Sequence, residues 1–290
     1  MRVVKESPRW ELAAVAEDAG PTREALLRDA SIRVVAVESG VKLHAAHALA
    51  ALEAGKHLHL EKPPSDNMRE FRQIVALARR KKLLVQMGYM WRYHPGFNAM
   101  LEAARSGWLG DIYLVRGTMN TLIDADRRPD WNLFRGGQMF EQGAHLIDPL
   151  VRLKGLPAII SPFLRSHGGF NDKMADNTAA VFEYPRALGI ITSSVLQPSA
   201  NAHRSFEIFG SNGTAVLRPI EPGTLAIDLV KPAGPYAAGI NRVKIAPFRR
   251  YVGDFDELAE AVAAGRPLAI TPEEDLKVHE ALLRASGMWS

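Results

Sequence analysis

The stretch RVVAVESGVKLHAAHALAALEAGKHLHLE, residues 33–61, decides the fold. It opens with a near-continuous apolar run, continues through an alanine-rich segment that Gly55 ends, and closes on a second apolar run. Strands that are apolar on both faces are typical of parallel sheets covered by helices on both sides. A helix between two such strands supplies the crossover that a parallel pair needs. Residues 33–61 therefore predict one β-α-β unit of a doubly wound parallel sheet.

The flanking segments extend this pattern in both directions. Downstream, a helix over 66–80 and a strand over 83–88 continue the alternation. Upstream, residues 10–16 predict a strand, followed by a short helix through 24–27, and residues 1–7 read as the end of a helix. A dinucleotide-binding sheet begins with a strand that runs into G-x-G-x-x-G. The sequence contains no such motif, so we expect an incomplete Rossmann-type sheet without its central first strand.

The second half of the chain has a different pattern, with longer strands separated by tight turns. We expect an α+β domain with an open, mostly antiparallel sheet, one embedded helix over 138–153 and two closing helices. The expected strands cover residues 112–118, 178–183, 187–195, 205–210, 214–218 and 225–230. With a boundary near Gly107–Gly110, the predicted domains are a shortened Rossmann-like domain (1–109) and an α+β domain with the closing helices (110–290).

Composition narrows the classes of protein to which the chain can belong. The 290 residues include no cysteine, which excludes a disulfide framework, a thiolate nucleophile and a cysteine-rich zinc site. The net charge is +4, and the densest basic run, residues 79–82, comes where a predicted helix ends, so no nucleic-acid partner is expected. No apolar run approaches the roughly 18 residues of a membrane span, and the amino end lacks a signal-peptide core. These features favour a cytoplasmic protein.

Lys62 stands in the tripeptide Glu61-Lys62-Pro63, at the end of the predicted strand 57–61. Ligands bind at the carboxyl ends of parallel strands in open α/β sheets. Pro63 disfavours the helical region for Lys62 and holds it extended. A desolvated lysine there can donate to an oxygen or join in proton transfer. On the tripeptide alone, a surface lysine before a loop is the simpler interpretation.

Glu141, His145 and Asp148 are spaced by four and three residues, which places them on one face of the predicted helix 138–153. The rest of this helix is apolar, so a polar stripe on it needs partners or a ligand. An imidazole can exchange a hydroxyl proton near neutral pH, and Glu141 can orient it. Two other interpretations stay open, a metal site of carboxylates and imidazole and a structural polar network.

Two further side chains are candidates for the substrate side. Trp131 lies shortly before Gly136-Gly137 and either walls a substrate pocket or packs between domains. Arg92 lies where the first domain leads into the second, and it either anchors a substrate or forms an interdomain ion pair, which is the preferred interpretation.

Two histidine pairs have spacings that are compatible with a metal ion. His44 and His47 lie three residues apart on one predicted helix, and His57 and His59 point to one side of a predicted strand. No further ligand accompanies either pair, so buried or helix-terminal histidines are the preferred interpretation.

Four segments carry a family resemblance in their order and spacing. They are LAALEAGKHLHLEKP (49–63), MGYMWRYHP (87–95), SGWLGDIYLVRG (106–117) and GGQMFEQGAHLID (136–148). Together they resemble the Gfo/Idh/MocA family, the glucose-fructose oxidoreductase and inositol dehydrogenase group. The resemblance implies an amino-terminal Rossmann domain that binds NAD or NADP and a carboxy-terminal α/β domain whose open sheet often forms oligomers. It also implies oxidation or reduction of a hydroxyl on a sugar, inositol or related polyol.

The resemblance also implies roles for particular residues. The family's E-K-P motif falls on residues 61–63, which become candidate cofactor contacts, with Lys62 polarising the oxygen near the nicotinamide. The histidine of the D-x-x-x-H pattern falls on His145 as the proton-exchanging group. Glu141 stands where relatives have the orienting aspartate, and the following acid, which often contacts substrate hydroxyls, falls on Asp148.

The cofactor side departs from the family pattern in two places. Where relatives often have Thr-Pro-Asn before a histidine, this chain has Ser39-Gly40-Val41 before His44, so Ser39 and His44 are the candidate contacts. Glu17 and Asp18 lie where relatives hold the adenosine ribose, and an acid there favours NAD over NADP.

The sequence therefore predicts an NAD(P)-dependent oxidoreductase for a carbohydrate-like substrate, without a metal, nucleic-acid or membrane partner. It also predicts a homo-oligomer formed through the carboxy-terminal sheet. The missing glycine-rich loop keeps a second hypothesis open. In that hypothesis the chain is a non-catalytic or cofactor-deficient sugar-binding or oligomer-forming paralogue, or a truncated product.

Overall fold

A computed structural model describes residues 2–17 and 20–289 of the chain. The chain divides into two compact units, a first unit of residues 1–90 and 249–279 and a second unit of residues 91–248 and 280–290. The division expected from the sequence, at 109/110, lies later in the chain and assigns both closing helices to the second domain. In the structure, most of these helices group with the first unit.

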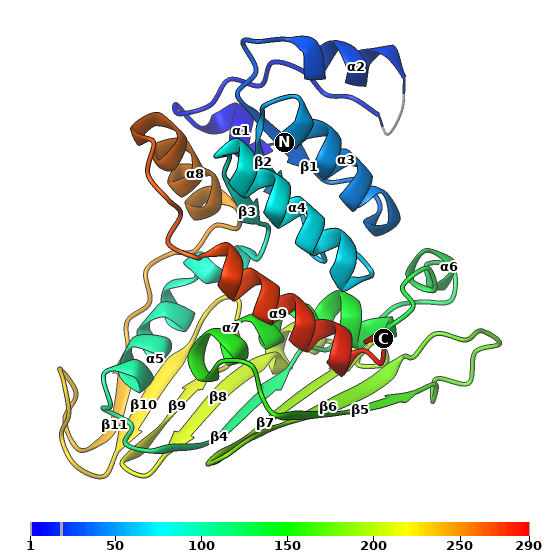
Figure 1. The fold of residues 1–290 in the computed structure, drawn as a ribbon. Helices are drawn as coiled ribbons and strands as arrows, with labels where there is room; N and C mark the ends of the chain where they lie inside the picture. The colour runs from blue at the N-terminus through cyan, green and yellow to red at the C-terminus, as the bar shows by residue number, and fades with distance from the viewer. Residues whose placement is uncertain (1, 18–19, 290) are drawn as a thin grey trace. The chain divides into compact units, whose positions relative to one another are not determined.

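A three-stranded parallel sheet in the order β1-β2-β3 forms the centre of the first unit (Figure 1). Leu58 and Leu60 of the middle strand are fully buried, as expected for a strand covered by helices. The expected alternation of strands and helices, and the parallel sheet, are confirmed. The elements are α1 (Arg2–Glu6), α2 (Pro21–Arg28), β1 (Val34–Val37), α3 (Val41–Glu53), β2 (His57–Leu60), α4 (Met68–Lys81), β3 (Val85–Met87), α8 (Val252–Ala264) and α9 (Pro272–Ala285), of which α9 ends in the second unit.

Two helices of the first unit, α4 and α9, begin at residues whose side chains cap them. Before α4, the Asn67 side chain accepts a hydrogen bond from the Glu70 backbone N–H at 3.0 Å. Before α9, the Thr271 hydroxyl accepts from the Glu274 backbone at 3.2 Å, and the Glu274 carboxylate accepts from the Thr271 backbone at 2.9 Å. These reciprocal bonds form a capping box. Within the described ranges, no helix is long and apolar enough to cross a membrane.

The expected strand over 10–16 is wrong, because these residues form no strand in the structure. Trp10 instead packs its ring edge-on against Phe255 of α8, with ring centroids 5.8 Å apart, and its indole N–H donates to the Phe255 carbonyl at 3.0 Å. A strand needs a partner for its backbone groups. Among the described residues, no strand pairs with this segment, so it stays outside the three-stranded sheet.

The second unit contains an eight-stranded sheet in the order β11-β10-β9-β8-β4-β7-β6-β5, antiparallel except for the β4–β7 pair. The open, mostly antiparallel sheet is confirmed, and β5, β11 and α5 are additions that the sequence did not reveal. Its elements are α5 (Pro95–Arg105), β4 (Ile112–Thr118), α6 (Arg128–Trp131), a π-helical turn (Met139–Gly143), α7 (Ala144–Lys154), β5 (Ile159–Arg165), β6 (Asn177–Tyr184), β7 (Ala187–Ser194), β8 (Ser205–Gly210), β9 (Gly213–Leu217), β10 (Leu225–Leu229) and β11 (Gly239–Val243).

Helices α5 and α7 cover one face of this sheet (Figure 1). Glycines on the covered face let α7 approach closely. A Cβ atom at Gly117 would lie 2.9 Å from Leu146, and one at Gly189 would lie 2.7 Å from Leu150. This close packing holds α7, which carries His145, against the centre of the sheet. Within the described part of the second unit, no helix covers the opposite face.

Candidate functional site

Lys62 lies directly after β2, at the carboxyl edge of the parallel sheet, and only 8% of its surface is exposed. The neighbouring strand comes close to it through a glycine. Gly88, after β3, donates its N–H to the Leu60 carbonyl at 2.7 Å, and a Cβ there would lie 2.8 Å from the Glu61 carboxylate. Lys62 is therefore a desolvated side chain at the edge where open α/β sheets bind ligands.

His44 joins two loops at this edge. Its Nδ1 lies 2.7 Å from the Pro63 carbonyl oxygen, and its Nε2 lies 2.6 Å from the Ser39 carbonyl oxygen. Carbonyl oxygens only accept, so both contacts are hydrogen bonds when the imidazole carries both protons. The Ser39 hydroxyl also lies 3.0 Å from His47 Nδ1. The structure thus brings the predicted residues Ser39, His44 and Pro63 together beside Lys62.

Tyr251 belongs to the same unit and was not predicted from the sequence. It precedes α8 with a left-handed φ of 66°, a conformation that costs energy for a residue with a side chain. Burial raises the pKa of its hydroxyl, and the negative charges of Glu61, Asp254 and Glu38 raise it further. The phenol therefore remains a neutral hydrogen-bond donor. No sequence signal marks it, because it stands in a loop without a motif.

In the second unit, the segment with Glu141 and His145 is a π-helical turn followed by α7, instead of one regular helix. A π turn contains one more residue than an α turn, and such turns are frequent at functional sites. Pro149 lies inside α7 and has no N–H to donate to the carbonyl of His145. The predicted helix is confirmed, but its first turn is wider than the four-residue spacing assumed.

Asp148 is neutralised by a buried ion pair. The Arg92 guanidinium donates to Asp148 Oδ1 from Nε at 3.0 Å and from Nη2 at 2.7 Å, and both side chains are 3% exposed. Arg152 lies 3.6 Å from the other carboxylate oxygen. Asp148 and Arg92 are thus brought together within the second unit. Their geometry is that of the polar network that the sequence left open as an alternative.

His145 is 7% exposed, and its ring lies 5.2 Å from that of Trp91, at an angle of 46°. The Trp91 indole N–H is held by the Glu221 carboxylate at 2.5 Å. Trp91 is a site residue that the sequence reasoning did not single out, although it lies in the segment MGYMWRYHP. Its signal in the sequence is an aromatic side chain within a segment that carries the family resemblance.

Trp131 lies in α6 and packs against a small buried cluster of Ile123, Met174 and Val195. This places Trp131 beside a core cluster of the second unit. Its predicted contact with a substrate stays a prediction.

The metal alternative for Glu141, His145 and Asp148 has no geometric support. Over residues 2–17 and 20–289, no group of three or more histidine, aspartate or glutamate side chains is arranged to hold a metal ion. Asp148 faces two arginines instead of a vacant coordination position.

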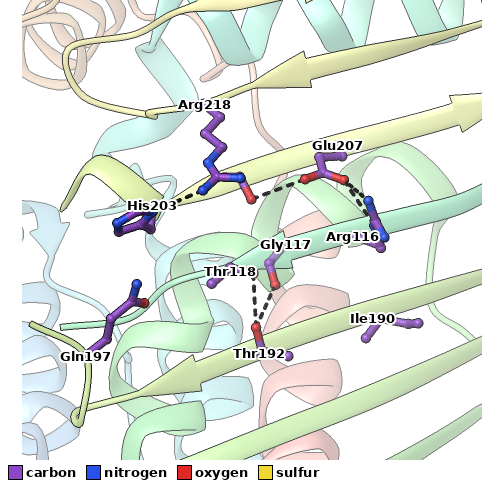
Figure 2. Close-up of a pocket in the computed structure, with 10 residues that line it drawn as sticks. Arg116, Gly117, Thr118, Ile190, Thr192, Gln197, His203, Glu207 and Arg218 are labelled. Carbon is purple, nitrogen blue, oxygen red and sulfur yellow. Dashed lines mark hydrogen bonds and ion pairs between the residues drawn. The ribbon is translucent and has the colours of Figure 1, made fainter. Parts of the chain in front are cut away.

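A groove of about 390 Å³ crosses the uncovered face of the eight-stranded sheet. Figure 2 shows the charged side chains along it. Arg116 on β4 donates to the Glu207 carboxylate on β8 at 3.0 Å, and Arg218 lies 3.0 Å from His203 Nδ1. All four side chains project from the face opposite α7.

Comparison with known proteins agrees with this arrangement. The family model "Oxidoreductase family, NAD-binding Rossmann fold" matches residues 2–89, and the model of the GFO/IDH/MocA C-terminal domain matches residues 97–216. The structure of UDP-N-acetylglucosamine 3-dehydrogenase from Acidithiobacillus ferrooxidans superposes with a TM-score of 0.77 at 20% identity, over 93% of this chain and 82% of that one. A likeness at that identity shows the shared fold.

Two curated relatives show the same kinship in sequence. Trans-1,2-dihydrobenzene-1,2-diol dehydrogenase of Mus musculus is 27% identical over 201 residues, 68% of this chain and 58% of that protein. D-glucoside 3-dehydrogenase of Escherichia coli K12 is 31% identical over 147 residues, 48% of this chain and 40% of that protein. The chain thus spans less than two thirds of the length of these relatives. The two matched domains, in this order and on this fold, make the chain a member of the Gfo/Idh/MocA oxidoreductase family.

Proposed function

We propose that the protein is an NAD(P)-dependent oxidoreductase that transfers hydride between a nicotinamide and a hydroxyl of a sugar, inositol or related polyol. The first-unit sequence matches an NAD-binding Rossmann fold. The two relatives described above are named as dehydrogenases of a diol and of a glucoside. Both names describe oxidation at a carbon that carries a hydroxyl.

The observation that carries the proposal is the cluster at the carboxyl edge of β1 and β2. Lys62 is buried there, and His44 lies within hydrogen-bonding distance of the carbonyls of Ser39 and Pro63. These groups fit the nicotinamide end of a dinucleotide. The contacts for the pyrophosphate end are less complete. A turn with the G-x-G spacing would supply them, and nowhere in the sequence are two glycines separated by a single residue.

When bound, the nicotinamide supplies or receives the hydride. Lys62 donates a hydrogen bond to the reacting oxygen and lowers the energy of the charge that develops there. His145 exchanges the hydroxyl proton at its imidazole, and Glu141 orients that ring. Ser39, His44 and residues 61–63 contact the cofactor. Glu17, the described member of the acidic pair Glu17-Asp18, favours NAD over NADP, while Asp18 lies outside the described residues.

On the substrate side, Asp148 forms a buried ion pair with Arg92 through one carboxylate oxygen, and Arg152 lies 3.6 Å from the other. That second oxygen can accept a hydrogen bond from a substrate hydroxyl. Trp131 supplies an apolar wall.

The first test is cofactor binding. NADH is titrated into the purified chain while nicotinamide fluorescence is recorded, and saturable binding supports the proposal. Lys62→Ala should abolish this binding or the turnover of a polyol. Lys42→Ala, an exposed lysine on α3, is the matched control and should change neither.

The second test is turnover with a panel of glucosides, inositols and cyclic diols. His145→Ala should lower turnover by about 10²–10⁴-fold, the usual contribution of a general acid or base. His167→Ala, an exposed histidine of the same unit, should leave it unchanged. Equal turnover of wild type and both active-site variants would remove these residues from the mechanism.

The second candidate function is a cofactor-deficient sugar-binding or oligomer-forming paralogue. The absence of a glycine-rich turn from the sequence favours it. A chain that binds a polyol by calorimetry but shows no saturable NADH fluorescence would support this function over the first.

We also propose that the uncovered face of the eight-stranded sheet binds a second copy of the chain. Leu188 on β7 and Ile159 and Phe163 on the edge strand β5 are 44–52% exposed on this face. Such apolar exposure is typical of an interface. Leu188→Glu should shift the mass measured by light scattering to that of a monomer, and Val15→Glu, at an exposed position of the first unit, should not.

A further inference from the structure

Arg128 is a buried arginine of the second unit to which neither the resemblance nor the proposed reaction gives a role. It lies in α6, three residues before Trp131, and is 3% exposed. Its guanidinium donates to the two Asp172 oxygens at 2.6 and 2.9 Å and to Asp176 at 3.1 Å. Its Cζ also lies 3.9 Å from the centroid of the Phe170 ring. A planar guanidinium is well suited to a two-pronged contact of this kind.

The two aspartates belong to the loop between β5 and β6 and fold it around Arg128. Asp176, which is 1% exposed, accepts hydrogen bonds from the backbone N–H groups of His167 at 2.8 Å and Gly168 at 3.1 Å. Asp172 accepts the Met174 N–H at 3.1 Å. We call Arg128, Asp172 and Asp176 the clasp. Its charge-assisted hydrogen bonds are the strongest class that side chains form, so the loop is held in one conformation.

Ala175, the neighbour of Asp176, connects the clasp to the segment with the candidate histidine. The Ala175 carbonyl accepts the Gln138 N–H at 3.2 Å, immediately before the π turn. Gly137 has a φ of +57°, and a Cβ there would lie 2.5 Å from the Ala175 carbonyl oxygen. Only glycine permits this approach, since it tolerates both the positive φ and the contact. The start of the π turn is thus docked on the residue next to the clasp.

The clasp also fixes α6 itself. Trp131 packs against Met174 of the same loop, together with Ile123 and Val195. The buried Arg128 side chain therefore holds two segments in place. They are the helix with Trp131 and the loop on which the π turn rests.

We infer that Arg128 is a positioning residue whose clasp with Asp172 and Asp176 sets the π turn, and through it the orientation of Glu141 and His145. The inference rests on the proposed function for its catalytic consequence, but its structural consequence is independent of it. The alternative is a clasp that contributes stability alone. The positioning role and the purely stabilising role predict different results for His145. A clasp that contributes stability alone leaves the surroundings of His145 unchanged at temperatures well below unfolding.

The test uses Arg128→Lys, which keeps the positive charge but loses the two-pronged contact. Arg186→Lys is the matched control, because Arg186 is 84% exposed and lies 3.6 Å from Asp111 in the same unit. The pH titration of the His145 ring is followed by NMR, with its signal assigned from its loss in His145→Asn. Arg128→Lys should move the midpoint by about 0.5 pH unit or more, while Arg186→Lys should not.

Turnover provides the second measurement. Arg128→Lys should lower kcat about tenfold or more, as small misplacements of reacting groups do, with an unchanged Kd for NADH. An unchanged His145 titration in a folded Arg128→Lys protein overturns the inference, whatever its melting temperature. If the wild type neither binds NADH nor turns over, the proposed function fails, and the NMR titration alone still decides the role of the clasp.

Discussion

The two sheets of this protein differ in how completely their strands are paired. In the eight-stranded sheet, β4 lies between β7 and β8, and Val115 at its centre is fully buried. In the three-stranded sheet, β1 pairs with β2 alone among the residues that the structure describes, and Ala36 in its middle is exposed. Parallel strands are normally buried on both faces and flanked by neighbours. The candidate cofactor edge is therefore built on a sheet with an open side, whereas His145 rests on a sheet whose central strands are fully paired.

The hydrogen bonds of β1 show which of its backbone groups do not bond to β2. The β2 segment bonds to the carbonyls of Arg33 and Val37, from the N–H groups of His57 at 2.9 Å and Glu61 at 3.0 Å. Backbone groups alternate in direction along a strand, so those of Val34 and Ala36 point to the other side. Among the described residues, no strand pairs with β1 on that side.

Hydrogen exchange measures this difference directly, and it is the largest effect expected. The amides of Val34 and Ala36 should exchange with an opening free energy near zero, whereas those of β4 should require about 5 kcal/mol or more. Val35 and Val37, which face β2 in the same strand, are the internal control and should be protected. Equal protection of all four β1 amides would mean that the outer edge is already paired.

Breaking the buried Arg92–Asp148 ion pair tests how much this pair contributes to the stability of the second unit. Asp148→Ala leaves Arg92 and Arg152 buried without their carboxylate, which should cost about 3–5 kcal/mol of its free energy of unfolding. Urea unfolding, read by hydrogen exchange for each unit separately, measures the loss.

The control for this variant is Asp111→Ala. Asp111 pairs with Arg186 at 3.6 Å, and both side chains are 84% exposed, so the loss should be within about 1 kcal/mol. A similar small loss for Asp148→Ala would show that water reaches the Arg92–Asp148 pair.

The contrast between paired and edge strands also explains which parts of the fold could be predicted from the sequence. Regular periodicity predicted the β-α-β unit of 33–61, because that pattern is local. The two edge strands β5 and β11 were missed. Pro162 interrupts the pattern of β5, and a proline is tolerated there only because an edge strand has one side without a partner.

The site itself was only partly predictable for a related reason. The positions of Lys62 and His145 follow from motifs, but the contact of Gln138 with the Ala175 carbonyl at the start of the π turn is not encoded by a four-residue spacing. The return of α8 to the first unit likewise depends on a distant contact. The Gln86 side chain on β3 donates to the Asp254 carbonyl at 2.9 Å, across 168 residues of sequence.

Acid should destabilise the first unit through its buried histidines. Burial lowers the pKa of His279 to about 3, and it also lowers that of His59. The unfolded state, with a pKa near 6.5, therefore binds more protons between about pH 6.5 and pH 3, so the free energy of unfolding falls as the pH falls through this window.

From pH 7 to pH 5, His279 should account for a loss of about 2 kcal/mol. Urea unfolding at the two pH values measures it. His279→Gln removes the titrating group and should flatten the pH dependence by that amount, even where it changes the stability at pH 7. An identical pH dependence in variant and wild type would mean that the folded protein admits the proton.

The smallest expected effect concerns the capping box of α9. Thr271→Ala removes the hydroxyl that accepts the Glu274 N–H at 3.2 Å, and should cost about 1 kcal/mol of stability. Thr271→Ser keeps the hydroxyl and should behave as wild type. Because α9 begins in the first unit, hydrogen exchange should show the loss there before it shows at β4 of the second unit. A uniform loss across both sheets would instead show that the two units unfold together, so that the open edge of β1 limits the stability of the whole chain.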